Sequence, residues 1–171
     1  MNAEDLRALQ APLKQRYRET PATAVVTLKA EAELDEAMVA CSVETARGMI
    51  TAGLHPASGG DGSLACSGDM LLQALIACAG VTVKAVATAL DITLEGGWIT
   101  AEGDLDFRGT LGVDREASVG FGAIRLSFAL KTDASPEKLA TLLKLTERYC
   151  VVLQTLRQAP PIEATMATTA G

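Results

Sequence analysis

Residues 70–90 form a long apolar stretch that strongly constrains what the chain can fold into. About 20 consecutive apolar residues are enough to cross a membrane as a helix. However, Gln73 and Lys84 lie inside the stretch, and its alanine, glycine and threonine residues lower its hydrophobicity. The rest of the chain has the composition of a soluble protein. We therefore interpret residues 70–90 as the buried central helix of a globular fold, not as a membrane span.

The segments on either side of this helix have the patterns of strands. Residues 22–53 are rich in valine, threonine, isoleucine and leucine in partial alternation, which predicts two or three antiparallel strands. Residues 92–114 predict strand segments interrupted by glycine, and the apolar alternation in residues 121–133 predicts a half-buried strand. Because this order lacks the regular alternation of a parallel sheet, the fold class is α+β.

The helix boundaries are marked by local signals. A loop rich in glycine and serine precedes the central helix and offers Ser67 or Asp69 as its N-cap. A second long helix begins at Ser135, which is its N-cap, and is stopped by Pro160. Residues 162–166 then predict a final edge strand.

Length and charge limit the class of protein. At 171 residues the chain is long enough for one domain, which we place at residues 21–171 after an exposed helical arm at residues 1–20. A net charge of −6 and the lack of a basic cluster argue against a nucleic-acid partner. The arm has no apolar core of a secretory signal, so we expect a cytoplasmic protein.

The cysteines are the main candidates for chemistry. Cys41, Cys66, Cys78 and Cys150 include no CxxC pair, and in a reducing cytosol they are expected to be thiols. His55 is the only histidine, so no paired spacing of metal ligands exists. No nucleophile motif surrounds Cys78 or His55, which disfavours a cysteine hydrolase. The glycine-rich loop lacks the lysine and threonine of a phosphate-binding loop.

Cys78 and Cys150 each lie on or near the buried face of a predicted long helix. If the helices pack side by side, the two thiols can face each other. A disulfide between them requires their Cα atoms to lie within about 7 Å. From spacing alone, the alternative is that both cysteines are small apolar residues of the core.

Residues 64–157 resemble the OsmC/Ohr family. The resemblance is carried in order by GDMLLQALIACAGVTV, AEGDLDFRGTLGVD, VGFGAIRLSFALKTDA and LTERYCVVLQTL. It implies an OsmC-like α+β fold in which antiparallel sheets wrap around two long central helices. It also implies an intertwined homodimer with active sites at the interface between its subunits. From charge and composition we expect neither a membrane partner nor a nucleic-acid partner.

The resemblance further implies a thiol-dependent peroxide reductase that acts in oxidative-stress defence, without cofactor or metal. Cys78 matches the peroxidatic cysteine and Cys150 the resolving cysteine. The substrate would be an organic hydroperoxide, and an external dithiol would be the reductant. Asp69 matches the position of the family's acidic residue. The matching arginine is expected to be Arg47, with Arg18 as the second choice.

The chain departs from the family pattern at two places. Val151 follows Cys150 where the family commonly has proline. Cys66, near the start of the central helix, is either a substitute resolving thiol or a loop residue without a redox role. These departures keep an alternative function open, namely a non-catalytic OsmC-like dimer that binds a small hydrophobic ligand in its interface cleft.

Overall fold

The computed structural model describes residues 2–5, 8, 10–11, 15, 19–20, 32–34, 40–45 and 48–168. Most of the described residues in the first twenty are helical and exposed. The predicted domain boundary near residue 21 lies outside the described residues, so it stays a prediction.

The fold contains both helices and strands, as the sequence predicts. In chain order the elements are β1 (Ala32–Leu34), β2 (Ala40–Thr45), β3 (Gly48–Gly53), the 3-10 helix η2 (Pro56–Ser58), β4 (Ala65–Cys66), α2 (Ser67–Ala89), β5 (Gly96–Leu105), α3 (Phe107–Thr110), β6 (Phe121–Lys131), α4 (Pro136–Tyr149) and α5 (Val151–Arg157). The first sheet has the order β1-β2-β3-β4, and β5 pairs with β6 in a second sheet. The pairs β1–β2, β2–β3 and β5–β6 are antiparallel. The α+β class is therefore confirmed.

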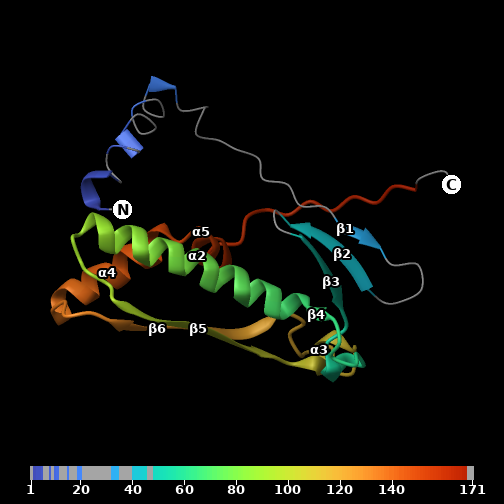
Figure 1. Cartoon of the computed structure of the whole chain (residues 1–171). Coiled ribbons are helices and arrows are strands. Elements are labelled where there is room, and N and C mark those ends of the chain that lie inside the picture. The colour runs from blue at the N-terminus through green and yellow to red at the C-terminus, as the bar shows by residue number, and fades with distance from the viewer. Residues whose placement is uncertain are drawn as a thin grey trace.

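Helix α2 runs along one face of the β5–β6 sheet, and α4 and α5 lie beside it (Figure 1). Its buried residues Leu75, Ala79, Val83 and Ala87 recur at every fourth position, which makes one apolar stripe. In β6, alternate residues are half-buried and turn towards the helices, as the sequence predicts. Two of these four buried residues are alanine. Because their side chains are small, α2 can pack closely against the sheet.

The start of α2 differs from the prediction. The helix begins at Ser67 with Cys66 in the N-cap position, and no side chain caps it. Neither Ser67 nor Asp69 is the N-cap, because the pairing of β4 with β3 keeps the chain extended up to Cys66. Asp69 lies in the first turn, where a carboxylate interacts favourably with the helix dipole.

The second predicted long helix is divided in the structure. Ser135 is its N-cap, as predicted, and its hydroxyl accepts a hydrogen bond from the backbone N–H of Lys138 at 3.4 Å. The helix α4 ends at Tyr149 because Cys150 has an extended backbone with φ −72° and ψ 106°. A new helix, α5, begins at Val151. The expectation of two continuous long helices is therefore wrong for the second one.

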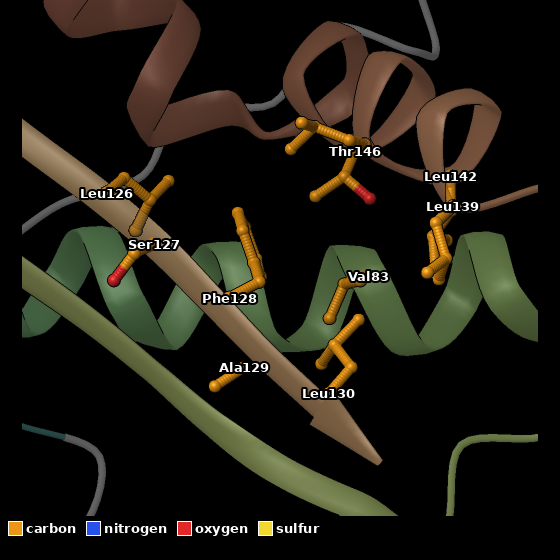
Figure 2. Close-up of a pocket in the computed structure, with 10 residues that line it drawn as sticks. Val83, Leu126, Ser127, Phe128, Ala129, Leu130, Leu139, Leu142 and Thr146 are labelled. Atoms are coloured by element: carbon orange, nitrogen blue, oxygen red, sulfur yellow. The ribbon is translucent and has the colours of Figure 1, made fainter. Parts of the chain in front are cut away.

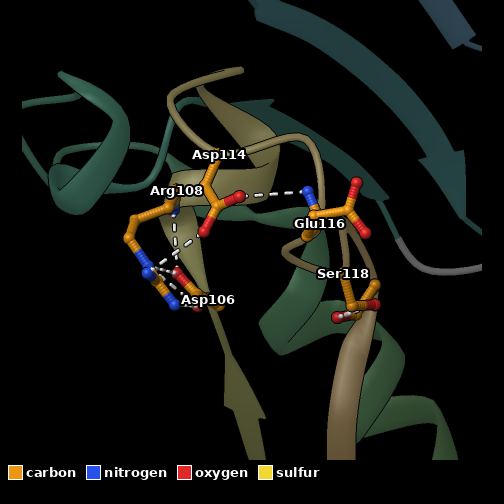
Figure 3. Close-up of polar contacts among 6 residues, drawn as sticks. Asp106, Arg108, Asp114, Glu116 and Ser118 are labelled. Atoms are coloured by element: carbon orange, nitrogen blue, oxygen red, sulfur yellow. Dashed lines mark hydrogen bonds and ion pairs between the residues drawn. The ribbon is translucent and has the colours of Figure 1, made fainter.

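The strand segments predicted over residues 92–114 are confirmed as β5, but the C-terminal part of this range and the predicted edge strand at residues 162–166 are not strands. Residues 106–114 include the short helix α3, in which the Asp106 side chain accepts from the N–H of Arg108 and forms an ion pair with the Arg108 guanidinium at 2.6 Å (Figure 3). Arg108 also forms an ion pair with Asp114 at 3.2 Å, so ion pairs within residues 106–114 stabilise this turn. Residues 162–166 have no regular structure. Ile162 is 84% exposed there, and none of the described strands pairs with this segment.

Candidate active site

Cys78 lies in the middle of α2, on the side that faces α5. It packs against a cluster of fully buried residues that includes Leu75, Ala79 and Cys150. Cys78 itself is half-buried, whereas Cys150 has no exposed surface. Both are free thiols. The structure therefore brings together the two cysteines that the sequence pairs, and leaves Cys78 as the accessible one.

The interruption between α4 and α5 at Cys150 places the N-terminus of α5 beside Cys78. Cys150 donates its N–H to the carbonyl of Thr146 at 2.9 Å, and its own carbonyl accepts from Gln154 at 2.9 Å. The N–H groups in the first turn of a helix have no partner inside that helix. In α5 those of Val151 and Val152 lie beside the Cys78 sulfur and lower its pKa. Such donors, together with the positive end of the helix dipole, stabilise a thiolate.

The two thiols have opposite shifts in acidity. Burial raises the pKa of Cys78, but the N–H of Val152, the Cys150 side chain and the N–H of Val151 more than offset this, so the pKa lies below the ordinary value. Burial raises the pKa of Cys150, and its interaction with Cys78 raises that pKa further. When one of the two thiols loses its proton, the negative charge is therefore more stable on Cys78, with Cys150 as the protonated hydrogen-bond donor.

Three other residues considered from the sequence lie away from this pair. Asp69 is exposed and precedes Cys78 by nine residues, which places it about 14 Å away along the helix axis and on the opposite face. Cys66 precedes Cys78 by twelve residues, about 18 Å along the axis, so it cannot resolve Cys78 of its own chain in this arrangement. His55 accepts a hydrogen bond at Nδ1 from the N–H of Ala57 at 3.0 Å, and its ring stacks on Phe107 at 4.9 Å.

The predicted activating arginines, Arg47 and Arg18, lie outside the described residues. Between residues 48 and 168, Arg108, Arg125 and Arg157 form ion pairs with carboxylates. In this part of the chain the pKa of Cys78 is lowered by the backbone N–H groups of Val151 and Val152 and by the Cys150 side chain. Sequence reasoning missed these groups, although the valine in place of proline after Cys150 was the signal that could have indicated them.

Comparison with known proteins assigns the family. The sequence model of the OsmC-like protein family matches residues 60–165, and the chain belongs to this family. No curated protein sequence matches the chain.

The fold is similar to several solved structures. An OsmC-like protein from Mycoplasma pneumoniae has a TM-score of 0.65 and 19% identity, covering 78% of this chain and 89% of that one. An organic hydroperoxide resistance protein from Elizabethkingia anophelis has a TM-score of 0.61 and 15% identity, covering 79% and 91%. The organic hydroperoxide resistance protein OhrB of Bacillus subtilis has a TM-score of 0.54 and 18% identity, covering 78% and 93%. At these identities the likeness shows the fold.

Proposed function

We propose that this protein is a thiol-dependent reductase of organic hydroperoxides that acts in the cytoplasm as part of oxidative-stress defence. The observation that carries the proposal is the half-buried Cys78 thiol, whose pKa is lowered beside the start of α5 and beside a second, fully buried thiol. A low pKa on an accessible thiol is the property that a nucleophilic cysteine needs at neutral pH. The names of two structural neighbours, which are organic hydroperoxide resistance proteins, support the substrate class.

The reaction has two steps on the protein. The Cys78 thiolate attacks the terminal oxygen of the hydroperoxide, the O–O bond breaks, and the alkoxide takes a proton and leaves as an alcohol. Cys78 is then a sulfenic acid. The sulfur of Cys150 attacks that of Cys78, the sulfenic hydroxyl takes the Cys150 proton and leaves as water, and a disulfide forms. An external dithiol reduces the disulfide and returns both thiols.

The surroundings of Cys78 favour an organic peroxide over hydrogen peroxide. Apolar side chains from α2, the sheet and α5 surround the pair, among them Ile124, Val152 and Leu153. Apolar surface gains free energy by covering the alkyl or aryl part of a substrate, and hydrogen peroxide has no such part.

The proposal is tested with the native protein, cumene hydroperoxide and dithiothreitol. We expect catalytic consumption of the peroxide. After one equivalent of peroxide without reductant, mass spectrometry should find a disulfide between Cys78 and Cys150, while Cys66 stays a thiol. No consumption, together with two unmodified thiols after peroxide treatment, would contradict the proposal.

A homodimer belongs to this proposal, because α2 leaves much apolar surface uncovered. Only 22% of the most apolar 18 residues of this helix is buried within one chain, and by length and composition alone the helix could also cross a membrane. Its outer face carries Leu71, Ala74, Ala77 and Val81, and Val81 is 74% exposed. These exposed residues are small or apolar, which suits close packing against another helix. We propose that α2 of a second copy packs against them in a homodimer.

The dimer prediction is tested by light scattering in buffer without detergent. The native protein should have the mass of two chains at micromolar concentration, because the uncovered stripe of α2 would be buried between the copies. Val81→Lys should shift the population towards single chains, whereas Thr100→Lys, on the exposed face of β5, should not. A native protein that stays a single chain, or one that needs detergent to remain in solution, would contradict this prediction.

A second candidate function is ligand binding without chemistry, with the cysteines as core residues. The complete burial of Cys150 beside Leu75 and Ala79 favours it, since free cysteine is often a small apolar residue of the core. The peroxide experiment separates the two, because a packing cysteine would remain unmodified.

A further inference from the structure

A cavity of about 540 Å³ lies between α2, β6 and α4, apart from the cysteine pair. Its walls are apolar, with Val83 from α2, Phe128 and Leu130 from β6, and Leu139 and Leu142 from α4 (Figure 2). This volume is in the range of pockets that hold small organic molecules, roughly 300 to 1,000 Å³. Neither Cys78 nor Cys150 lines it.

One polar atom in the wall of this cavity is unsatisfied. Thr146 is 1% exposed, and its hydroxyl has no hydrogen-bond partner in the part of the chain that the structure describes. Figure 2 shows its side chain projecting from α4 towards Val83 and Phe128. A buried hydroxyl without a partner costs stability, and such groups are usually satisfied by a ligand or an ordered water. The Thr146 hydroxyl therefore indicates where the polar group of a ligand would sit.

The lining defines the chemistry of the ligand. The residues that line the cavity include no charged side chain, so a carboxylate or an amine would be buried without a counter-charge. Apart from the exposed Ser127, the remaining walls are apolar and suit an alkyl chain. A hydroxyl group can both donate to and accept from the Thr146 hydroxyl. We propose that this cavity binds a neutral amphiphile with one hydroxyl head and a medium-length alkyl chain, with the head at Thr146.

This site is independent of the proposed peroxide chemistry. Thr146 lies one helical turn before Cys150, whose N–H it accepts through its backbone carbonyl at 2.9 Å. Its side chain instead lines the cavity, which neither Cys78 nor Cys150 lines. Binding of an alcohol therefore needs no thiolate, and a variant without the Cys78 thiol should bind as the native protein does.

The test is calorimetric titration of the full-length protein with octan-1-ol, with octanoate at pH 8 as the charged ligand of equal chain length. We expect octan-1-ol to bind the native protein and Cys78→Ser equally. Octanoate should bind at least about tenfold more weakly, because its charge would be buried unpaired. Binding of both ligands with equal affinity would overturn the proposal, since it would place the head outside the cavity.

Thr146 variants test the position of the head. Thr146→Val keeps the shape of the side chain and removes the hydroxyl, so octan-1-ol should bind about fivefold more weakly. Thr146→Ser keeps the hydroxyl and should stay within about twofold of the native affinity. Because Thr146→Val also removes an unsatisfied buried group, it should melt no lower than the native protein without ligand. The proposal would be overturned if octan-1-ol bound neither the native protein nor Cys78→Ser. It would also be overturned if Thr146→Val bound octan-1-ol as tightly as the native protein does.

Discussion

Replacing Cys78 with serine is expected to abolish peroxide turnover, with a fall of at least about a thousandfold. A serine hydroxyl is almost fully protonated at neutral pH, and the N–H groups of Val151 and Val152 cannot lower its pKa enough to change that. Serine has nearly the shape of cysteine, so the half-buried position should remain folded. The measurement is the initial rate of cumene hydroperoxide consumption with dithiothreitol.

The matched control for this variant is Cys66→Ser. Cys66 is also half-buried, and it precedes the same helix. Because it lies about 18 Å from Cys78 along the helix axis, its loss should leave the rate within about twofold of native. A Cys78→Ser variant that keeps its turnover, or a Cys66→Ser variant that loses it, would overturn the assignment of Cys78 as the nucleophile.

Replacing Cys150 with serine is expected to leave the reduction of the first peroxide by Cys78 intact but to prevent the disulfide formation that regenerates Cys78. The serine hydroxyl can still donate a hydrogen bond to the Cys78 thiolate, so the first peroxide should be reduced at close to the native rate. Without the second thiol, Cys78 then stays a sulfenic acid and a further peroxide oxidises it irreversibly. We expect a burst of about one equivalent and then a fall in turnover of roughly tenfold or more. Stopped-flow kinetics and mass spectrometry of the Cys78 peptide measure both phases.

The partner variant Cys150→Ala removes the donor as well as the thiol. Its first phase should be slower than that of Cys150→Ser by about threefold to tenfold, because one of the groups that lower the Cys78 pKa is lost. Equal first phases in the two variants would show that Cys150 does not stabilise the thiolate. Sustained native turnover in both would show that it does not resolve Cys78.

The parts of the fold with a clear periodicity could be predicted from the sequence. The apolar stretch of α2, the alternation in β6 and the cap at Ser135 each follow from local side-chain patterns, and the structure confirms them. The pairing of Cys78 with Cys150 came from the family resemblance, because spacing alone did not distinguish a reactive pair from two core residues. The structure brings the two thiols together across α2 and α5.

The features that escaped prediction depend on single backbone positions. The division between α4 and α5 results from the extended conformation of Cys150, which interrupts an otherwise helical apolar pattern. Helix α2 begins earlier than the capping signals predict, because β4 keeps Cys66 extended through pairing with β3, a contact that no local signal encodes. The predicted strand at residues 162–166 has suitable residues but no neighbouring strand among the described elements.

The central claim is that the start of α5 holds Cys78 as a thiolate. Its most direct test is the rate of iodoacetamide labelling of the Cys78 peptide as a function of pH. The labelling rate follows the thiolate fraction, so a lowered pKa moves the half-maximal rate to a lower pH. Val151→Pro is the informative variant, because proline fits the first position of α5 and follows an extended residue, yet it removes one N–H donor to Cys78.

We predict a half-maximal labelling rate of Cys78 at a lower pH in the native protein than in the unfolded protein, and an intermediate value in Val151→Pro. Cys66 provides the internal reference in the same digests. A midpoint for native Cys78 at or above that of the unfolded protein would contradict the account, because the thiol would then be an ordinary residue of the core.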